Sequence, residues 1–451
     1  MAYSNSVLVA AALLASLPLG KAAFAQPAAE AARIPFSAVI ERPDDLELNA
    51  RFARQQIGDG NLAGAASTLE RLLILRPDWD AVRLTYGVVL FRLGQSEEAA
   101  AEFDAVNPEA LEPDDRATLE RFRGLVARSR QRVTGTVGLS AGVHYDTNRN
   151  NFPLSGNFIV DLPGIGDTII EGQDGENADL GFIGIADIRV DYDTDSQIVP
   201  RVSFEAAALT DQQVEEDTLD AVSGFVGVSA VIDAGPVDLV PAAVYRQIFL
   251  GEENYLSSPE GRLRVERRIG TDARLRAFLE GRVGYEDYSG VDADPFASEA
   301  DGLFYEGRIG VAYTPVARLN LGLAYTYTGK EADFAFEAFD AHEIEATAQY
   351  VVTSGFSVLG RASYTRQTFD GPDPFISTSL VQTDDEVEVG LGAIVTAAEL
   401  LSRAGLEETP AALDNVTINL SVDYQRVNSS VENFEFDNWR FGLLITKRLS
   451  F

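Results

Sequence analysis

From about residue 133 to the end of the chain, apolar and polar side chains alternate with a period of two. In the first such segment Val137 and Leu139 lie on one face, and Ser140 and His144 lie on the other. Successive side chains of a β-strand point to opposite faces, so this chain predicts sheets with one apolar and one polar surface. Segments of about ten residues with aromatic residues towards their ends are typical of a transmembrane β-barrel.

The alternation predicts about fourteen antiparallel strands, an even number, as bacterial barrels require. They are expected near 133–146, 178–190, 200–210, 221–232, 237–249, 260–269, 273–287, 302–314, 317–329, 341–352, 356–369, 384–396, 415–426 and 438–450. Long polar loops are expected at 147–177, 211–220, 250–259, 288–301, 330–340, 370–383 and 427–437, and short turns at the opposite strand ends. Short turns belong to the periplasm and long loops to the exterior. The stretch 397–414 departs from this order, because it should be short but has helix-forming composition.

The last strand carries a second barrel feature. Phe451 ends the chain, and Phe441, Leu443, Ile445 and Leu449 share its face. An alternating apolar strand with a terminal aromatic residue resembles the assembly signal of outer-membrane barrels, although Lys447 interrupts the face. A soluble β-sandwich is the alternative, but it would not require apolar residues on the outer face of nearly every strand.

Composition excludes several other classes of protein. Hydrophobic residues make up 46% of the chain, yet no apolar run reaches the ~20 residues of a transmembrane helix. A formal net charge of −34 argues against nucleic acid as a partner. Cysteine is absent, so no thiolate metal site, cysteine nucleophile or lipid-anchored cysteine is possible. We expect no cofactor or metal and no enzyme activity. A dyad of His144 with a nearby serine is the one catalytic arrangement left open.

The first 25 residues have the form of a cleaved signal peptide. An apolar core at 7–19 precedes Ala23, Phe24 and Ala25, which form a small-x-small cleavage site. Its amino-terminal region contains no Lys or Arg, which departs from the usual pattern. We expect residues 26–43, rich in Pro and Ala, to form a tether.

Residues 44–131 form a predicted helical domain with an internal repeat. At an offset of 34 residues Gly60 matches Gly94 and Ala65 matches Ala99. This period and order of small residues resembles the tetratricopeptide repeat, and a third helical stretch at 114–130 could cap the stack. We expect a periplasmic domain that binds a client protein. A plain helical plug or spacer is the alternative. The candidate client-binding residues are Arg83, Tyr86 and Phe91.

The polar face of the strands predicts a charged lumen. Its basic candidates are Arg262, Arg264, Arg268, Arg274, Arg276, Arg282 and Arg308, and its acidic candidates are Glu343, Glu345, Glu386 and Glu388. These residues would either form a basic wall that faces an acidic wall, as in a porin constriction, or pair across adjacent strands.

The order of parts, with the segment at 138–150 and its sequence Tyr145-Asp146-Thr147-Asn148, resembles the surface lipoprotein assembly modulators, the Slam family of type XI secretion. The resemblance implies an outer-membrane translocator that delivers a partner lipoprotein or secreted protein from the periplasm to the cell surface. Its implied partners are this client, outer-membrane lipid, the barrel-assembly machinery and a periplasmic chaperone. A passive porin, an exopolysaccharide exporter with tetratricopeptide repeats and an outer-membrane enzyme are the rival functions.

Overall fold

The computed structural model describes residues 33–129, 131–162, 164–172, 175–215, 217–270, 274–406 and 409–451. The predicted signal peptide and the first part of the predicted tether lie outside these residues. The chain divides into two compact units, with the boundary between Arg132 and Val133. Among the described helices, none is long and apolar enough to cross a membrane.

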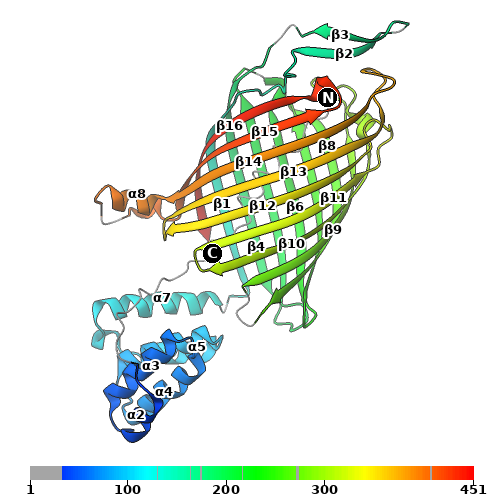
Figure 1. Ribbon diagram of the computed structural model, residues 1–451. Helices are drawn as coiled ribbons and strands as arrows, with labels where there is room; N and C mark the ends of the chain where they lie inside the picture. Colours follow the sequence, from blue (N-terminus) through cyan, green and yellow to red (C-terminus); the bar gives the residue numbers. More distant parts are fainter. Residues whose placement is uncertain are drawn as a thin grey trace. The chain divides into compact units, whose positions relative to one another are not determined.

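The described part of the first unit consists of helices and the turns between them (Figure 1). Its elements are α2 (Phe36–Glu41), α3 (Leu46–Gly58), α4 (Leu62–Leu75), α5 (Asp80–Arg92), α6 (Ser96–Asp104), the 3-10 turn η1 (Pro108–Ala110) and α7 (Pro113–Ser129). Side-chain caps begin α3 and α4. Asp45 accepts a hydrogen bond from the Leu48 amide, and Asn61 accepts one from the Gly64 amide, each at 3.0 Å.

The predicted 34-residue repeat is confirmed in the helix pairs α3–α4 and α5–α6. Gly60 and Gly94 occupy equivalent helix–helix turns with φ of +79° and +84°, a conformation that favours glycine. Ala65 and Ala99 are both fully buried, as is Phe103. Small residues therefore lie where paired helices approach closely.

The described residues of the helical unit form two hydrophobic clusters. One contains Ala53, Leu69 and Leu72 from α3 and α4. The other contains Phe103 and Leu119, so α7 contributes to it and closes the second pair. The structure differs from the predicted tether at residues 33–43, where α2 packs on α3. Phe36 stacks on Phe52 at 6.0 Å, because Phe36 and Val39 supply an apolar face.

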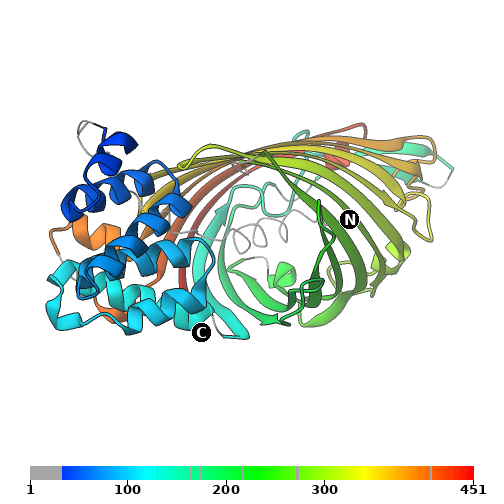
Figure 2. The same ribbon diagram turned by 90° about the horizontal axis from the view of Figure 1, so that it is seen from below.

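The second unit is a closed, antiparallel, 14-stranded barrel, as predicted. β1 pairs with both β4 and β16, which closes the ring (Figure 2). Its strands are β1 (Val133–Asp146), β4 (Asp179–Asp193), β5 (Arg201–Gln213), β6 (Ala221–Asp233), β7 (Asp238–Leu250), β8 (Glu253–Ile269), β9 (Leu275–Tyr288), β10 (Gly302–Val316), β11 (Leu319–Lys330), β12 (Phe339–Thr353), β13 (Phe356–Pro372), β14 (Val381–Thr396), β15 (Val416–Ser429) and β16 (Phe436–Ser450).

The outer face of the barrel is apolar and exposed. Ile309 and Leu391, in the middle of their strands, are 57% and 60% exposed. Exposed aromatic residues on this face occur near both strand ends. Tyr145, Tyr285 and Trp439 lie near the ends with long connections, and Tyr192, Tyr313 and Tyr350 lie near the ends with short turns. An apolar band between two aromatic girdles is the pattern of a barrel surrounded by lipid.

The connections follow the predicted alternation except at one place. Residues 250–259 were expected to form a long loop, but only Gly251 and Glu252 separate β7 from β8. Both have positive φ, +54° and +70°, which is the conformation of a tight hairpin turn, so the two strands continue beyond their expected ends. The unusual stretch 397–414 contains α8 (Ala397–Arg403), as its composition predicts.

The first long connection contains an additional hairpin that the sequence pattern did not predict. β2 (Asn157–Leu162) pairs with β3 (Gly166–Glu171) and forms a separate two-stranded sheet (Figure 1). Short 3-10 turns occur in other connections: η2 (Asp217–Leu219), η3 (Ala297–Ala300), η4 (Ala411–Leu413) and η5 (Glu432–Phe434).

The last strand closes the barrel with its apolar face outward. The side chains expected to form the assembly signal are all exposed, and these are Phe441, Leu443, Ile445, Leu449 and Phe451. The Phe451 amide donates to the Gly135 carbonyl at 3.0 Å, so the last residue still pairs with β1. Lys447 donates to the carbonyls of Ala412 and Asp414 at 2.9 and 2.6 Å, which places its charge against the connection that contains α8.

Candidate functional site

The barrel interior contains the charged residues expected from the sequence. Apolar residues between them, such as Leu263, Leu279 and Ile309, are exposed on the outer face, so alternation turns the charged neighbours inward. The strands place these residues on β8 (Arg262, Arg264, Arg268), β9 (Arg276, Arg282), β10 (Arg308), β12 (Glu343, Glu345) and β14 (Glu386, Glu388), with Arg274 immediately before β9.

A first network of ion pairs connects β7 to β10. Arg282 contacts Glu260 at 3.5 Å and Glu306 at 2.8 Å, and Glu260 also pairs with Arg246. Arg264 pairs with Glu266 on its own strand and reaches Glu280 at 3.4 Å. Its guanidinium also lies 3.9 Å from the centre of the Phe278 ring. Each arginine here is neutralised by carboxylates on its own or neighbouring strands.

A second network is centred on Arg361 of β13, which the sequence prediction omitted. Arg361 contacts Glu345 at 2.8 Å, Glu388 at 3.3 Å and Glu343 at 3.9 Å. Glu345 also accepts a hydrogen bond from Arg308 at 2.6 Å, across the intervening strand β11. The inward position of Arg361, between two strands rich in glutamate, was the available sequence signal.

These contacts favour pairing across strands over two opposed walls of charge. The basic residues of β8–β10 and the acidic residues of β12–β14 are joined through Arg308 and Glu345. Of the two arrangements that the sequence left open, these contacts support pairing across strands, because Arg282, Arg308 and Arg361 each contact carboxylates on nearby strands.

Two arginines of the barrel interior differ from those above because no carboxylate pairs with them among the described residues. Arg268 and Arg276 are direct register partners on β8 and β9, both are exposed, and neither forms an ion pair among the described residues. They lie near the short-turn end of the barrel. Arg262 also lacks an ion pair among these residues, and its buried Nε has no hydrogen-bond partner there. The Arg274 guanidinium donates to the Pro315 carbonyl at 3.2 Å. Uncompensated positive charge inside the barrel is thus concentrated on β8 and β9.

A buried cluster around His144 lies at the long-connection end of β1. The His144 Nδ1 lies 2.7 Å from Asp146 Oδ2, and the His144 Nε2 lies 2.6 Å from Asp211 Oδ1 on β5. Because ionised carboxylates only accept hydrogen bonds, this geometry suits a ring with protons on both nitrogens. Neither nitrogen is free to activate a serine, so the structure does not support the dyad that the sequence left open.

The same cluster joins the first and last strands of the barrel. Asp146 is fully buried and accepts hydrogen bonds from Asn438 and Arg440 of β16, each at 2.8 Å. The His144 ring crosses β4 at Gly181, where an added Cβ would lie only 2.2 Å from Nε2. Glycine at this position allows β1 to contact β5 over the intervening strand.

The candidate client-binding residues of the helical unit all make internal contacts. Arg83 pairs with Glu102 at 2.7 Å and donates to the Pro77 carbonyl. Tyr86 packs between the two clusters, where burial raises the pKa of its hydroxyl. Phe91 contacts the ring of Phe122 edge-on at 5.8 Å. These contacts hold the helices together, and a role in client binding stays a prediction.

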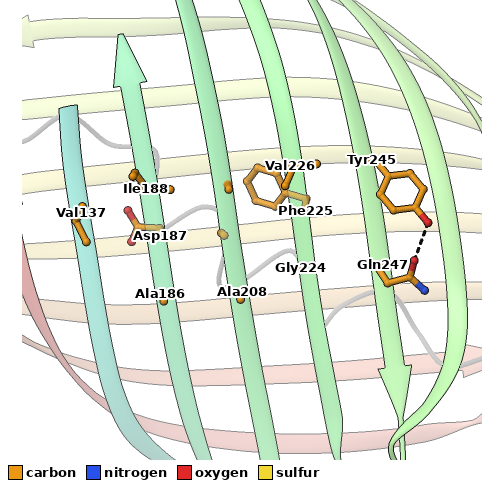
Figure 3. A pocket seen from close by; sticks show the side chains of 12 residues that line it. Val137, Ala186, Asp187, Ile188, Ala208, Gly224, Phe225, Val226, Tyr245 and Gln247 are labelled. Carbon is orange, nitrogen blue, oxygen red and sulfur yellow. Dashed lines mark hydrogen bonds between the residues drawn. The ribbon is translucent and has the colours of Figure 1, made fainter. Parts of the chain in front are cut away.

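A hollow of about 580 Å³ crosses the outer wall of β1 and β4–β7 (Figure 3). Outward-facing small residues, among them Ala186, Ala208 and Gly224, form its floor. Tyr245 donates a hydrogen bond to Gln247 at 2.7 Å on one side. The lining is almost entirely apolar, so this hollow belongs to the outer apolar face rather than to the charged interior.

Comparisons with known proteins match the helical unit to a repeat family and find solved outer-membrane proteins at low similarity. Residues 56–121 match the family model described as tetratricopeptide repeat. No curated protein matches the chain. Similar solved structures include an outer membrane channel from Pseudomonas putida F1 (11% identity, 70% of this chain, 96% of that chain, TM-score 0.35). OmpT, an outer membrane protein of Vibrio cholerae, is 10% identical (71% and 98% covered, TM-score 0.37). A bacterial polysaccharide outer membrane secretin is 9% identical (70% and 98% covered, TM-score 0.33).

Proposed function

We propose that the protein is an outer-membrane transport barrel that delivers a partner lipoprotein or secreted protein from the periplasm to the cell surface. The observation that carries this proposal is the joining, in one chain, of tetratricopeptide repeats to a closed barrel that is apolar outside and charged inside. No cofactor and no catalysis are part of the proposal.

The outer surface supports the membrane location. Ile309 and Leu391 belong to a continuous band of exposed apolar side chains. Exposure of such a band to water would be unfavourable, whereas lipid acyl chains cover it without this cost. The apolar outer face of β16, where Phe441, Leu443 and Ile445 are exposed, would be recognised by the barrel-assembly machinery.

The topology supports a periplasmic helical unit. β1 begins at Val133, at the barrel end that has the short turns, and the helical unit immediately precedes it in the chain. Short turns face the periplasm in bacterial barrels. The helical unit would then meet clients, or a chaperone that carries them, before they reach the barrel.

Tetratricopeptide repeats favour a polypeptide client because stacked helix pairs present extended surfaces to other proteins. Inside the barrel, ion pairs such as Arg361–Glu345 leave a wall of mixed, largely compensated charge. A wall of this kind would not hold one charged segment strongly, which suits passage of a chain with varied side chains.

Deletion of the gene followed by quantitative surface and culture-medium proteomics tests the proposal. We expect one or a few proteins to leave the surface or the medium and to accumulate in the periplasm, with recovery on complementation. If no protein is lost from either fraction, the translocator function is excluded.

A passive porin is the second candidate, and the exposed pair Arg268 and Arg276 favours it. A porin would give a stable ohmic conductance in planar bilayers. Replacing both residues by glutamine should then shift its selectivity towards cations. Arg366→Gln is the matched control, because Arg366 lies on the outer face and is exposed. An exopolysaccharide exporter would instead be indicated by glycosyltransferase genes beside this one.

A further inference from the structure

The connections at the long-loop end of the barrel have a one-sided charge. They comprise residues 147–178, 214–220, 251–252, 289–301, 331–338, 373–380 and 430–435. Every one of them contains Asp or Glu, and Arg149 is their only basic residue. The short-turn end differs, since Arg274, Arg318 and Arg403 occur there beside the acidic residues. Negative charge is therefore concentrated at one end.

The few cations near this end are already engaged. Arg149 is mostly buried and lies 3.7 Å from Asp211. Lys330, at the end of β11, is buried and pairs with Glu286 at 2.9 Å. The exposed side chains of Asp292, Asp333 and Glu432, in contrast, have no cationic partner among the described residues. The acidic surface is thus open to a cationic partner.

The same end also exposes apolar side chains that touch across two connections. Phe296 and Phe375 come from the β9–β10 and β13–β14 connections, and their rings stack at 5.9 Å. They are 63% and 59% exposed. Two phenylalanine rings that contact each other but remain open to solvent are costly unless another surface covers them.

The hairpin β2–β3 is held beside this apolar surface and exposes an apolar side chain of its own. The Asp161 amide donates to the Phe375 carbonyl at 3.2 Å, and Ser377 Oγ donates to Asp167 at 2.6 Å. These bonds hold the hairpin beside Phe375, and Ile165 at its turn is 77% exposed. Figure 1 shows β2 and β3 beyond the strand ends on this side. We define Phe296, Phe375 and Ile165 as the loop-end patch.

We propose that the loop-end patch binds a polypeptide that carries basic residues on either side of an apolar segment. The apolar segment covers the two rings and Ile165, while the basic residues meet the surrounding carboxylates. An apolar centre with a charged rim is the usual arrangement of a protein interface. The uncompensated charge attracts a basic partner from a distance and repels an acidic one. Binding of this polypeptide at the loop-end patch is a further function, beyond the proposed transport function.

Binding can be measured on the full-length protein in zwitterionic lipid nanodiscs, with empty nanodiscs as the blank. The probe is a labelled, soluble peptide with lysines flanking a Phe-Leu-Phe segment. One matched peptide has glutamate in place of lysine, and the other has serine in place of the apolar residues. We expect the first peptide to bind at least about tenfold more tightly than either match, and its affinity to fall as salt is raised.

Two variants test the surface itself. The first is the double variant Phe296→Ser and Phe375→Ser, which removes the two rings and should weaken binding about tenfold. The second is the triple variant Asp292→Asn, Asp333→Asn and Glu432→Gln, which removes three exposed carboxylates. It should also weaken binding about tenfold. Leu406→Ser is the matched control, because Leu406 is 55% exposed, close to the two phenylalanines, but lies in the connection that contains α8. Heat-modifiable migration in SDS gels confirms that each variant remains folded.

Equal binding of all three peptides, or unchanged binding by the double phenylalanine variant, would overturn the proposal. Binding of Ca²⁺ alone in equilibrium dialysis, with no peptide bound, would overturn it too and would assign the carboxylates to cations. Because binding is measured on the purified protein, its failure leaves the transport proposal, tested in cells, undecided by this result.

Discussion

Single residues at the barrel closure carry buried charge that is stabilised only by its neighbours. His144 lies between Asp146 and Asp211, and Arg440 adds a further hydrogen bond to Asp146. Removing one member of such a group leaves the others buried without compensation, which costs much more than losing an exposed ion pair. The cluster therefore contributes to barrel stability although its residues lie on the inward, polar face of the strands.

His144→Ala should lower the free energy of unfolding by about 3–5 kcal/mol, because two buried carboxylates lose their shared donor. The measurement is urea unfolding in detergent micelles. The matched control is His342→Ala, since His342 is exposed on the outer face, where its Nδ1 lies 2.8 Å from the Tyr325 hydroxyl. Equal effects of the two substitutions would contradict the assigned role of the cluster.

At the scale of elements, the β7–β8 connection shows how backbone conformation sets strand length. Gly251 and Glu252 both have positive φ, so the turn reverses the chain in two residues and the strands pair up to it. A side chain at either position opposes this conformation, and glutamate already does so at 252.

Gly251→Val should therefore destabilise the barrel by about 1–2 kcal/mol, and Glu252→Gly should stabilise it by about 1 kcal/mol. Equilibrium unfolding in micelles measures both effects. A flexible ten-residue loop, which the sequence pattern predicted, would tolerate both substitutions. If neither variant changed the free energy of unfolding, the tight turn would be refuted.

At the scale of the whole molecule, each unit contains its own stabilising contacts. The helical unit has hydrophobic clusters around Leu72 and Phe103. The barrel closes through β1 and β16 and has its ion pairs between its own strands. Because the stabilising contacts lie within each unit, we expect each unit to remain folded when the other is altered.

Removing residues 46–127 should leave a barrel that is still heat-modifiable in SDS gels and rich in sheet by circular dichroism. The same truncation should abolish client export, because the client would no longer be held near the barrel. Normal export by the truncated protein would contradict the client-holding role. Loss of heat-modifiable migration would contradict independent folding of the barrel.

The sequence alone determined the two kinds of architecture, because their signals are local. Alternation at residues such as Val137, Leu139 and Ser140 predicts strands, and summing it along the chain predicted their number. The 34-residue offset that relates Gly60 to Gly94 likewise predicted the helix pairs. These patterns follow from the periods of strands and helices and need no knowledge of distant neighbours.

Only the tertiary structure decided which residues distant in the sequence contact one another. Arg361 joins glutamates of β12 and β14, and His144 reaches Asp211 over Gly181. Phe296 stacks on Phe375 from another connection. Such contacts depend on the register between strands and on loops that meet in space. Alternation along one strand assigns a side chain to a face, but it cannot specify which distant residue lies opposite.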